Sequence, residues 1–189
     1  AWLKSIHEQI CYIRDNDLPI HIDNNSWEDF EKGKDVIRYI TAEWGQHEPE
    51  NLQCPYDGSE RSVAGCLPIA YAIKMRYHQW PSKGNGITEP YSNVPSRNLE
   101  HTYDWNNMIM EYYNSSYSEQ EADAVATLVA DIGAALQAEY SSESTSADYA
   151  LQKISYHFNY SSNIRMVYKN WFDQYEWMSL IKKELFENG

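Results

Sequence analysis

Residues 62–81, SVAGCLPIAYAIKMRYHQWP, contain a Gly-Cys pair followed by a helical pattern. Apolar side chains recur there at the spacing of one helix face. They are Ile69, Ala70, Ile73, Met75 and Tyr77. Pro81 cannot continue a helix and predicts its end. The pattern therefore predicts a helix that begins at Cys66.

Cys66 is the strongest candidate for a reactive group in the chain. The N-terminus of a helix carries partial positive charge and unpaired N–H groups, and both stabilise a thiolate over a thiol. A buried core cysteine is the alternative interpretation of this position. Gln46 lies upstream in the tripeptide Trp44-Gly45-Gln46, and its amide could donate to a developing oxyanion. Such a glutamine is meaningful only in combination with Cys66.

Length and composition restrict the classes of function. The chain has 189 residues, of which 42% are hydrophobic and 14% aromatic, enough to form one domain with a core. Its formal charge of −13 argues against nucleic acid or an anionic membrane surface as a partner. No stretch approaches the roughly 18 apolar residues of a spanning helix. The segment His21-x-Asp23-Asn24-Asn25 lacks the Gly and Glu of a calcium loop, so no metal site and no cofactor is expected.

The cysteines indicate neither a disulfide framework nor a zinc site. Cys11, Cys54 and Cys66 cannot all pair with one another, and their spacings match no zinc motif. At least one thiol is therefore free. Cys11 lies on an apolar helical pattern and Cys54 in a Pro-containing loop, so both are expected to be packing residues.

Residues 1–40 differ in pattern from the rest of the chain. Trp2 to Arg14 has apolar residues on one helix face, and Ser26 is a fair cap for a short helix over 27–32. Residues 34–40 are extended or begin another short helix. Residues 41–65 contain Gly, Pro and scattered acids and predict a long loop. A loop of this length in a compact domain is more often functional than idle.

The second half of the chain is predicted to be mainly helical. Ser118 to Glu121 forms a capping box, followed by an apolar stripe up to Leu136. The run Ser141 to Ser146 predicts a polar loop, and residues 87–103 look irregular. The remaining predicted elements are a short helix over 106–113, a helix over 147–157, a short strand over 165–168 and a helix over 171–186.

The order and spacing of several motifs resemble the streptopain family of secreted bacterial cysteine peptidases. The resemblance covers residues 41–189 and is carried by Trp44-Gly45-Gln46, Pro49, Cys54-Pro55-Tyr56, Ala64-Gly65-Cys66, Met75 to Pro81, Gly84-Asn85-Gly86, Tyr103 to Asn106, Asp131-Ile132-Gly133 and Ala150-Leu151. It implies a mainly α (α+β) chain that forms the helical, nucleophile-bearing lobe of a papain-like peptidase, with the β-rich lobe largely absent. Residues 1–40 resemble the end of a propeptide.

The same resemblance implies roles for individual residues. Cys66 would be the nucleophile and Gln46 the oxyanion donor. Ser142, Glu143 and Ser144 would lie near the substrate, although this loop lacks the glycines of the family. The expected partner is a protein or peptide substrate, and the expected location is the exterior or cell envelope of a bacterium.

The sequence departs from the family in two places. Leu67-Pro68-Ile69-Ala70 follows the cysteine where the family usually has small residues. A papain-like nucleophile also needs a His, usually about 130–150 residues downstream, and the chain ends at Gly189 before that position. His78, His101 and His157 are expected to be structural or solvated. We therefore expect a companion chain or segment to supply the catalytic His. The alternative is a truncated, non-catalytic homologue that binds or inhibits a peptidase.

Overall fold

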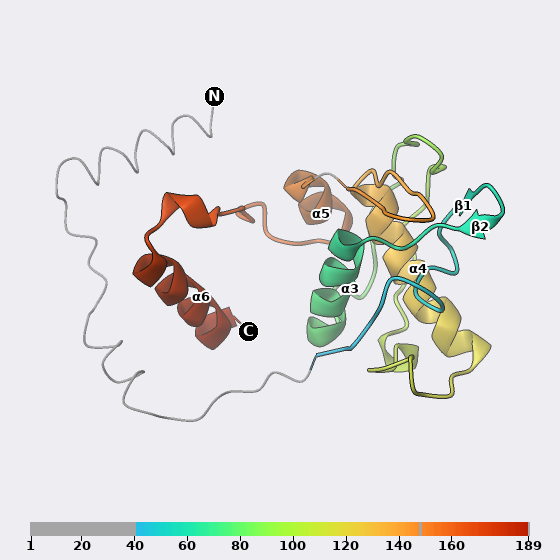
Figure 1. The fold of residues 1–189 in the computed structure, drawn as a ribbon, viewed down its shortest axis with the longest axis horizontal. Coiled ribbons are helices and arrows are strands. Elements are labelled where there is room, and N and C mark those ends of the chain that lie inside the picture. Colours follow the sequence, from blue (N-terminus) through green and yellow to red (C-terminus); the bar gives the residue numbers. More distant parts are fainter. Residues whose placement is uncertain (1–40, 148, 189) are drawn as a thin grey trace. The chain divides into compact units, whose positions relative to one another are not determined.

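The computed structural model describes residues 41–147 and 149–188 (Figure 1). The predicted helix over Trp2 to Arg14, the elements over 27–40, the packing role of Cys11 and the propeptide interpretation of 1–40 lie outside these residues. The described residues belong to the unit Ile40–Gly189.

The helix predicted to start at the candidate nucleophile forms, but Ala70 and Tyr77 of its predicted apolar positions are exposed. Helix α3 spans Cys66–His78, and Pro68, Ile69, Ala72 and Met75 form its buried face. It ends at Gln79, whose φ of 48° is left-handed and whose N–H bonds back to the last turn of the helix. The helix therefore ends just before Trp80-Pro81.

Helix α4 is the centre of the core. It spans Glu119–Ala135, and the predicted capping box is present at Ser118 and Glu121, with both reciprocal hydrogen bonds. Leu128, Val129 and Ile132 are fully buried. Burying each such side chain stabilises the fold by about 1.5–3 kcal/mol. Helix α3 packs beside α4, which fixes the position of Cys66 relative to the core (Figure 1).

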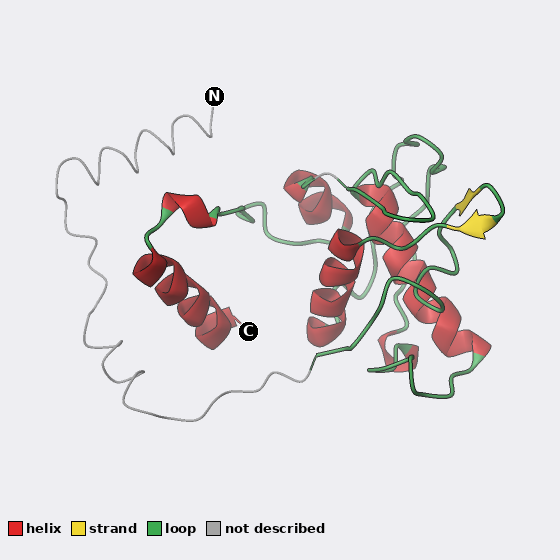
Figure 2. Ribbon diagram, in the orientation of Figure 1, coloured by secondary structure: helices red, strands yellow, loops and turns green. Residues whose placement is uncertain are grey.

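The remaining elements of the described chain are mostly short, and its regular secondary structure is mainly helical (Figure 2). Strands β1 (Tyr56–Asp57) and β2 (Glu60–Arg61) pair antiparallel around Gly58. The helices are α5 (Leu151–His157) and α6 (Gln174–Asn188), with 3-10 turns at Trp105–Asn107 and Lys169–Trp171. The predicted fold class is confirmed. No helix in the described ranges is long and apolar enough to cross a membrane.

The predicted helix over 106–113 is wrong beyond its first turn. Only Trp105–Asn107 forms a 3-10 turn. The following backbone has partners elsewhere, because Ile109 O accepts from Trp44 Nε1 at 2.9 Å and Met110 O accepts from Glu43 N at 2.7 Å. These long-range bonds hold the segment extended, so the local helical pattern is overridden.

Three further predictions, over 147–157, 165–168 and 171–186, need correction. The helix predicted over 147–157 begins only at Leu151, since Ser146 pairs with Glu139 and keeps the chain extended before it. Residues 165–168 form no strand, because no neighbouring strand in the described part of the chain bonds to them. The last helix starts at Gln174, where Asp173 and Glu176 exchange capping hydrogen bonds at 2.8 and 2.9 Å.

Candidate active site

Cys66 is exposed at the first position of α3, whereas the four residues before it are buried. The polypeptide therefore emerges from the core at this residue. Cys54 is buried, as expected for a packing residue, and burial raises the pKa of its thiol to about 11. Of the two cysteines in the described ranges, only Cys66 is accessible to a reagent or a substrate.

Hydrogen bonds from three other segments fix the backbone before Cys66. Ala64 N donates to Gln46 O at 2.9 Å, and Val63 N donates to Ser141 O at 3.1 Å. Thr145 Oγ1 donates to Val63 O at 2.6 Å. The amide of the buried Asn51 donates to Ser62 O at 3.0 Å. The backbone before Cys66 is therefore joined both to the Gln46 segment and to the Ser-rich loop.

Position 65 requires glycine for two reasons, its backbone conformation and the close approach of Thr145. Its φ is +91°, and a Cβ at this position would lie 2.9 Å from Thr145 Cγ2 and 3.1 Å from Thr145 Cβ. Side chains rarely adopt this φ. The close approach of Thr145 thus depends on the glycine that precedes Cys66.

Glu50 holds the turn that contains Gln46. Its carboxylate accepts from Gly45 N at 2.9 Å, and it is only 3% exposed. Burial raises the pKa of this carboxyl group, which the hydrogen bond from Gly45 partly offsets. Neither Glu50 nor Asn51 was singled out from the sequence, because a buried acid and a buried amide in a polar loop look like solvated residues.

The Ser-rich loop lies against the residues before Cys66 and contains the predicted substrate-binding residues. Ser142 donates to Asp57 Oδ2 through its N at 3.0 Å and its Oγ at 3.2 Å. Ser144 N donates to Ser141 Oγ at 3.0 Å, and Glu143 is exposed. The fold thus brings Cys66, the Gln46 segment and this loop to one end of α3, and the roles assigned to these residues stay predictions.

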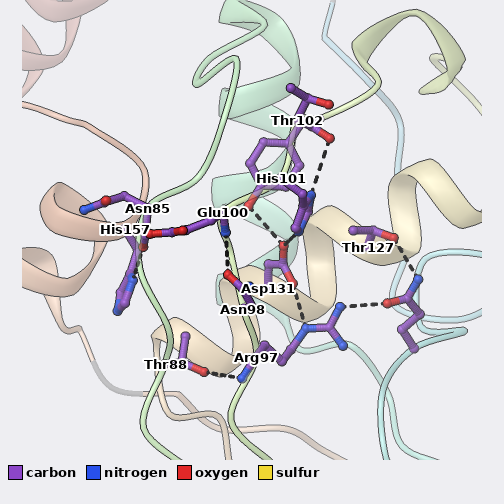
Figure 3. A network of polar contacts seen from close by, with 12 residues as sticks. Asn85, Thr88, Arg97, Asn98, Glu100, His101, Thr102, Thr127, Asp131 and His157 are labelled. Carbon is purple, nitrogen blue, oxygen red and sulfur yellow. Dashed lines mark hydrogen bonds and ion pairs between the residues drawn. The ribbon is translucent and has the colours of Figure 1, made fainter.

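Three of the histidines have structural surroundings. His101 Nε2 lies 2.8 Å from Asp131 Oδ2, and this hydrogen bond raises the pKa of His101 (Figure 3). His157 Nδ1 lies 2.8 Å from Asn85 O. His78 ends α3, about 18 Å from Cys66 along the helix axis. His101 and His157 are thus hydrogen-bonded and His78 is exposed; that none of the three acts as the base stays a prediction.

His47 was not singled out from the sequence, yet it is next to Gln46 and exposed. Its carbonyl accepts from Asn51 N at 3.3 Å. A lone histidine in a polar loop gives no signal of its own. Only the fold shows that it follows a residue whose carbonyl accepts from Ala64 N in the nucleophile segment. No group of three His, Cys, Asp or Glu side chains in the described ranges is arranged to hold a metal ion.

Comparison with known proteins gives the site a family context. Residues 44–189 match the peptidase C10 family. The chain is 29% identical to streptopain of Streptococcus pyogenes over 143 residues, and the match covers 68% of this chain and 35% of streptopain. It is 23% identical to the thiol protease/hemagglutinin PrtT of Porphyromonas gingivalis over 154 residues, which cover 77% of this chain and 18% of that protein. The chain thus spans about a third or less of the length of these relatives.

Solved structures of similar proteins have the same fold. Active interpain A, a cysteine protease of Prevotella intermedia, superposes with a TM-score of 0.72 and 28% identity, covering 79% of this chain and 65% of that one. A mutant fragment of prointerpain A gives a TM-score of 0.72 and 25% identity, covering 97% and 61%. These similarities support the papain-like fold expected from the sequence.

Proposed function

The chain belongs to the peptidase C10 family, and we propose that it is the helical, nucleophile-bearing part of a cysteine endopeptidase of streptopain type. One observation carries the proposal. Cys66 is exposed at the first turn of α3, and the backbone before it is bonded to the Gln46 segment and to the Ser-rich loop. A nucleophile, an oxyanion donor and a substrate-facing loop would thus share one end of the helix.

In the proposed reaction the Cys66 thiolate attacks the carbonyl carbon of a peptide bond. The Cys66 N–H and the Gln46 amide hold the oxyanion of the tetrahedral intermediate. A histidine then protonates the leaving amine as the C–N bond breaks, and water hydrolyses the remaining thioester. Ser142, Glu143 and Ser144 line the path of the substrate.

The general base of the proposed enzyme comes from a companion segment outside these residues. Support comes from three of the four described histidines, because His101 and His157 are hydrogen-bonded elsewhere and His78 is at the far end of α3. The fourth, His47, is exposed beside Gln46 and is the one internal alternative among the described residues. Residues 1–40 are a propeptide remnant in this proposal, so the protein is made as a zymogen, and it is secreted or held at the cell envelope of a bacterium.

The test measures two reactivities of the 189-residue chain. Iodoacetamide should alkylate Cys66, while cleavage of an unfolded protein under reducing conditions should be essentially absent. Adding a segment that carries the family's catalytic histidine should restore cleavage, and Cys66→Ala should abolish it. Cleavage by the chain alone that is lost in Cys66→Ala would show an internal base. His47→Ala would then be the first variant to measure, with His78→Ala as the matched control.

The contacts of the histidines also favour a second candidate function. A homologue without a base at Cys66 could bind a peptidase or its propeptide without cleaving it. In that case no added histidine segment would restore cleavage, and Cys66→Ala would leave the binding unchanged.

A further inference from the structure

A cavity of about 300 Å³ lies beside the Ser-rich loop and is lined by Tyr91, Gln137, Glu139, Ser146 and Ala147. Its volume is at the lower end of the range for ligand pockets. All five lining residues come from the irregular segment before α4 and from the chain that follows this helix. None of them has a role in the proposed chemistry at Cys66.

Hydrogen bonds hold the backbone and one side chain of the residues that line this cavity. Glu139 N donates to Ser146 O at 2.8 Å, and Ser146 N donates to Glu139 O at 3.2 Å. Residues that exchange both bonds in an antiparallel pair direct their side chains to the same face. The Glu139 carboxylate is held in turn by Tyr91, whose hydroxyl donates to Oε1 at 2.9 Å.

The cavity carries negative charge. Among the described residues that line it, Glu139 is the one carboxylic acid and none has a basic side chain. In the described part of the chain the ion pairs join Arg97 and His101 to Asp131, so no cation neutralises Glu139. A cationic side chain that entered the cavity would meet a carboxylate with hydroxyl and amide groups around it.

Ser146, one of the residues that line the cavity, lies close to Cys66. Ser146 directly follows Thr145, whose methyl group packs against Gly65, the residue before Cys66. These steps place Ser146 no more than about 15 Å from Cys66, which is the span of about four residues of extended peptide.

We propose that this cavity is a specificity pocket for a lysine or arginine side chain of the substrate, within about four residues of the scissile bond. The proposal rests on the peptidase function proposed for Cys66. Glu139 would be the specificity-determining residue, and Tyr91 would position its carboxylate.

The test uses tetrapeptide acyloxymethyl ketones, which alkylate a cysteine nucleophile at a rate that reports peptide binding. Lysine is placed at each position in turn and compared with norleucine, which has a chain of similar length without the charge. The rate of Cys66 labelling in the 189-residue chain is measured by peptide mapping. At one position lysine should react up to about fivefold faster, the size expected of a partly exposed ion pair.

The variants separate charge from shape. Glu139→Gln keeps an acceptor for the Tyr91 hydroxyl and should remove the preference, and Glu139→Lys should reverse it. Glu100→Gln removes the same charge from an exposed position outside the cavity and should keep the preference. If either Glu139 variant fails to fold, Ser146→Arg should remove the preference by filling the cavity with a cation.

Equal labelling by lysine and norleucine reagents at all positions would overturn the proposal, as would a preference that survives in Glu139→Gln. If no peptide reagent labels Cys66 even after the segment with the catalytic histidine is added, the proposed peptidase function fails. Equilibrium binding of a fluorescent lysine tetrapeptide to the Cys66→Ala variant then tests separately whether the cavity binds a lysine side chain. Binding that is weakened by Glu139→Gln supports the pocket, and equal affinity for the norleucine peptide overturns it.

Discussion

Cys66 and Asp131 both belong to residue types that carry catalysis, but the structure holds them in opposite ways. Cys66 is exposed, and the contacts that position it are made by the backbone of the residues before it. Asp131 is buried on α4, and its oxygens accept from Arg97 Nε at 2.6 Å, Tyr103 Oη at 3.0 Å and His101 Nε2 at 2.8 Å. We call these four residues the Asp131 cluster: Asp131, Arg97, His101 and Tyr103.

The difference shows that a His-Asp pair is not by itself a catalytic site. In the Asp131 cluster the carboxylate is buried and accepts three hydrogen bonds. These bonds join the irregular segment 87–103 to α4. Arg97 extends the network to Gln53, with Nη2 2.7 Å from Gln53 Oε1. Cys66 differs because its side chain is exposed and its sulfur is accessible to other molecules.

The largest expected effect is on the stability contributed by the Asp131 cluster. Asp131→Ala leaves a guanidinium, a hydroxyl and an imidazole without their acceptor, so the free energy of unfolding should fall by about 3–5 kcal/mol. Urea denaturation followed by circular dichroism measures this. Cys66→Ala should change it by less than about 0.5 kcal/mol, as expected of an exposed residue. Similar losses in the two variants would remove the distinction between the two regions.

The second prediction concerns the backbone that presents Cys66. Gly65→Ala places a Cβ 2.9 Å from Thr145 Cγ2 at a φ of +91°, so stability should fall by about 1–3 kcal/mol and Cys66 alkylation should slow. Gly45→Ala is the matched control, because nothing lies within 4 Å of a Cβ at that position. A Gly65→Ala variant with normal stability and labelling rate would show that this geometry is not needed.

A smaller effect should follow from the hydroxyl of Thr145. Thr145→Val keeps the shape and removes the hydrogen bond to Val63 O, which should cost about 1 kcal/mol of stability. It should also lower the rate of Cys66 alkylation, since Val63 lies in the nucleophile segment. Thr145→Ser keeps the hydroxyl and should recover the labelling rate. A normal rate in Thr145→Val together with a reduced rate in Thr145→Ser would contradict the prediction and show that the methyl group matters instead of the hydroxyl.

Local signals in the sequence were sufficient to predict the two helices α3 and α4. The Ser118–Glu121 capping box and the apolar stripe predicted α4, and the Gly-Cys pair with a later Pro predicted the start and end of α3. Each of these signals acts within a few residues, so tertiary structure had little opportunity to override it.

The contacts between distant segments could not be predicted in the same way. Residues 106–113 have helical spacing, but bonds to Glu43 and Trp44 keep part of them extended. The burial of Glu50 and the pairing of Glu139 with Ser146 likewise depend on segments far apart in the sequence. The resemblance to streptopain predicted which segments meet at Cys66, whereas composition and spacing did not.

The smallest predicted effect is the pH dependence of the Asp131 cluster. The hydrogen bond to Asp131 outweighs burial and the nearby Arg97 and raises the pKa of His101. Its contribution to stability should therefore be fully present below the unfolded pKa of about 6.5 and lost as pH rises through the folded value. Because the ring is more than a third exposed, the loss should be under about 1 kcal/mol. Unfolding in urea at a series of pH values measures it, and His101→Gln should flatten that part of the profile.

His78 provides a control of opposite sign on α3. Burial, with a smaller effect of Lys74, lowers the pKa of His78. Its contribution should be present above about pH 6.5 and lost as pH falls through the folded value, so His78→Gln should remove a slope of the opposite sign. The backbone before Cys66 should not contribute to either slope, because its hydrogen bonds join backbone and uncharged groups. If Cys66→Ala changed the slope as much as His101→Gln, the two regions would be coupled rather than independent.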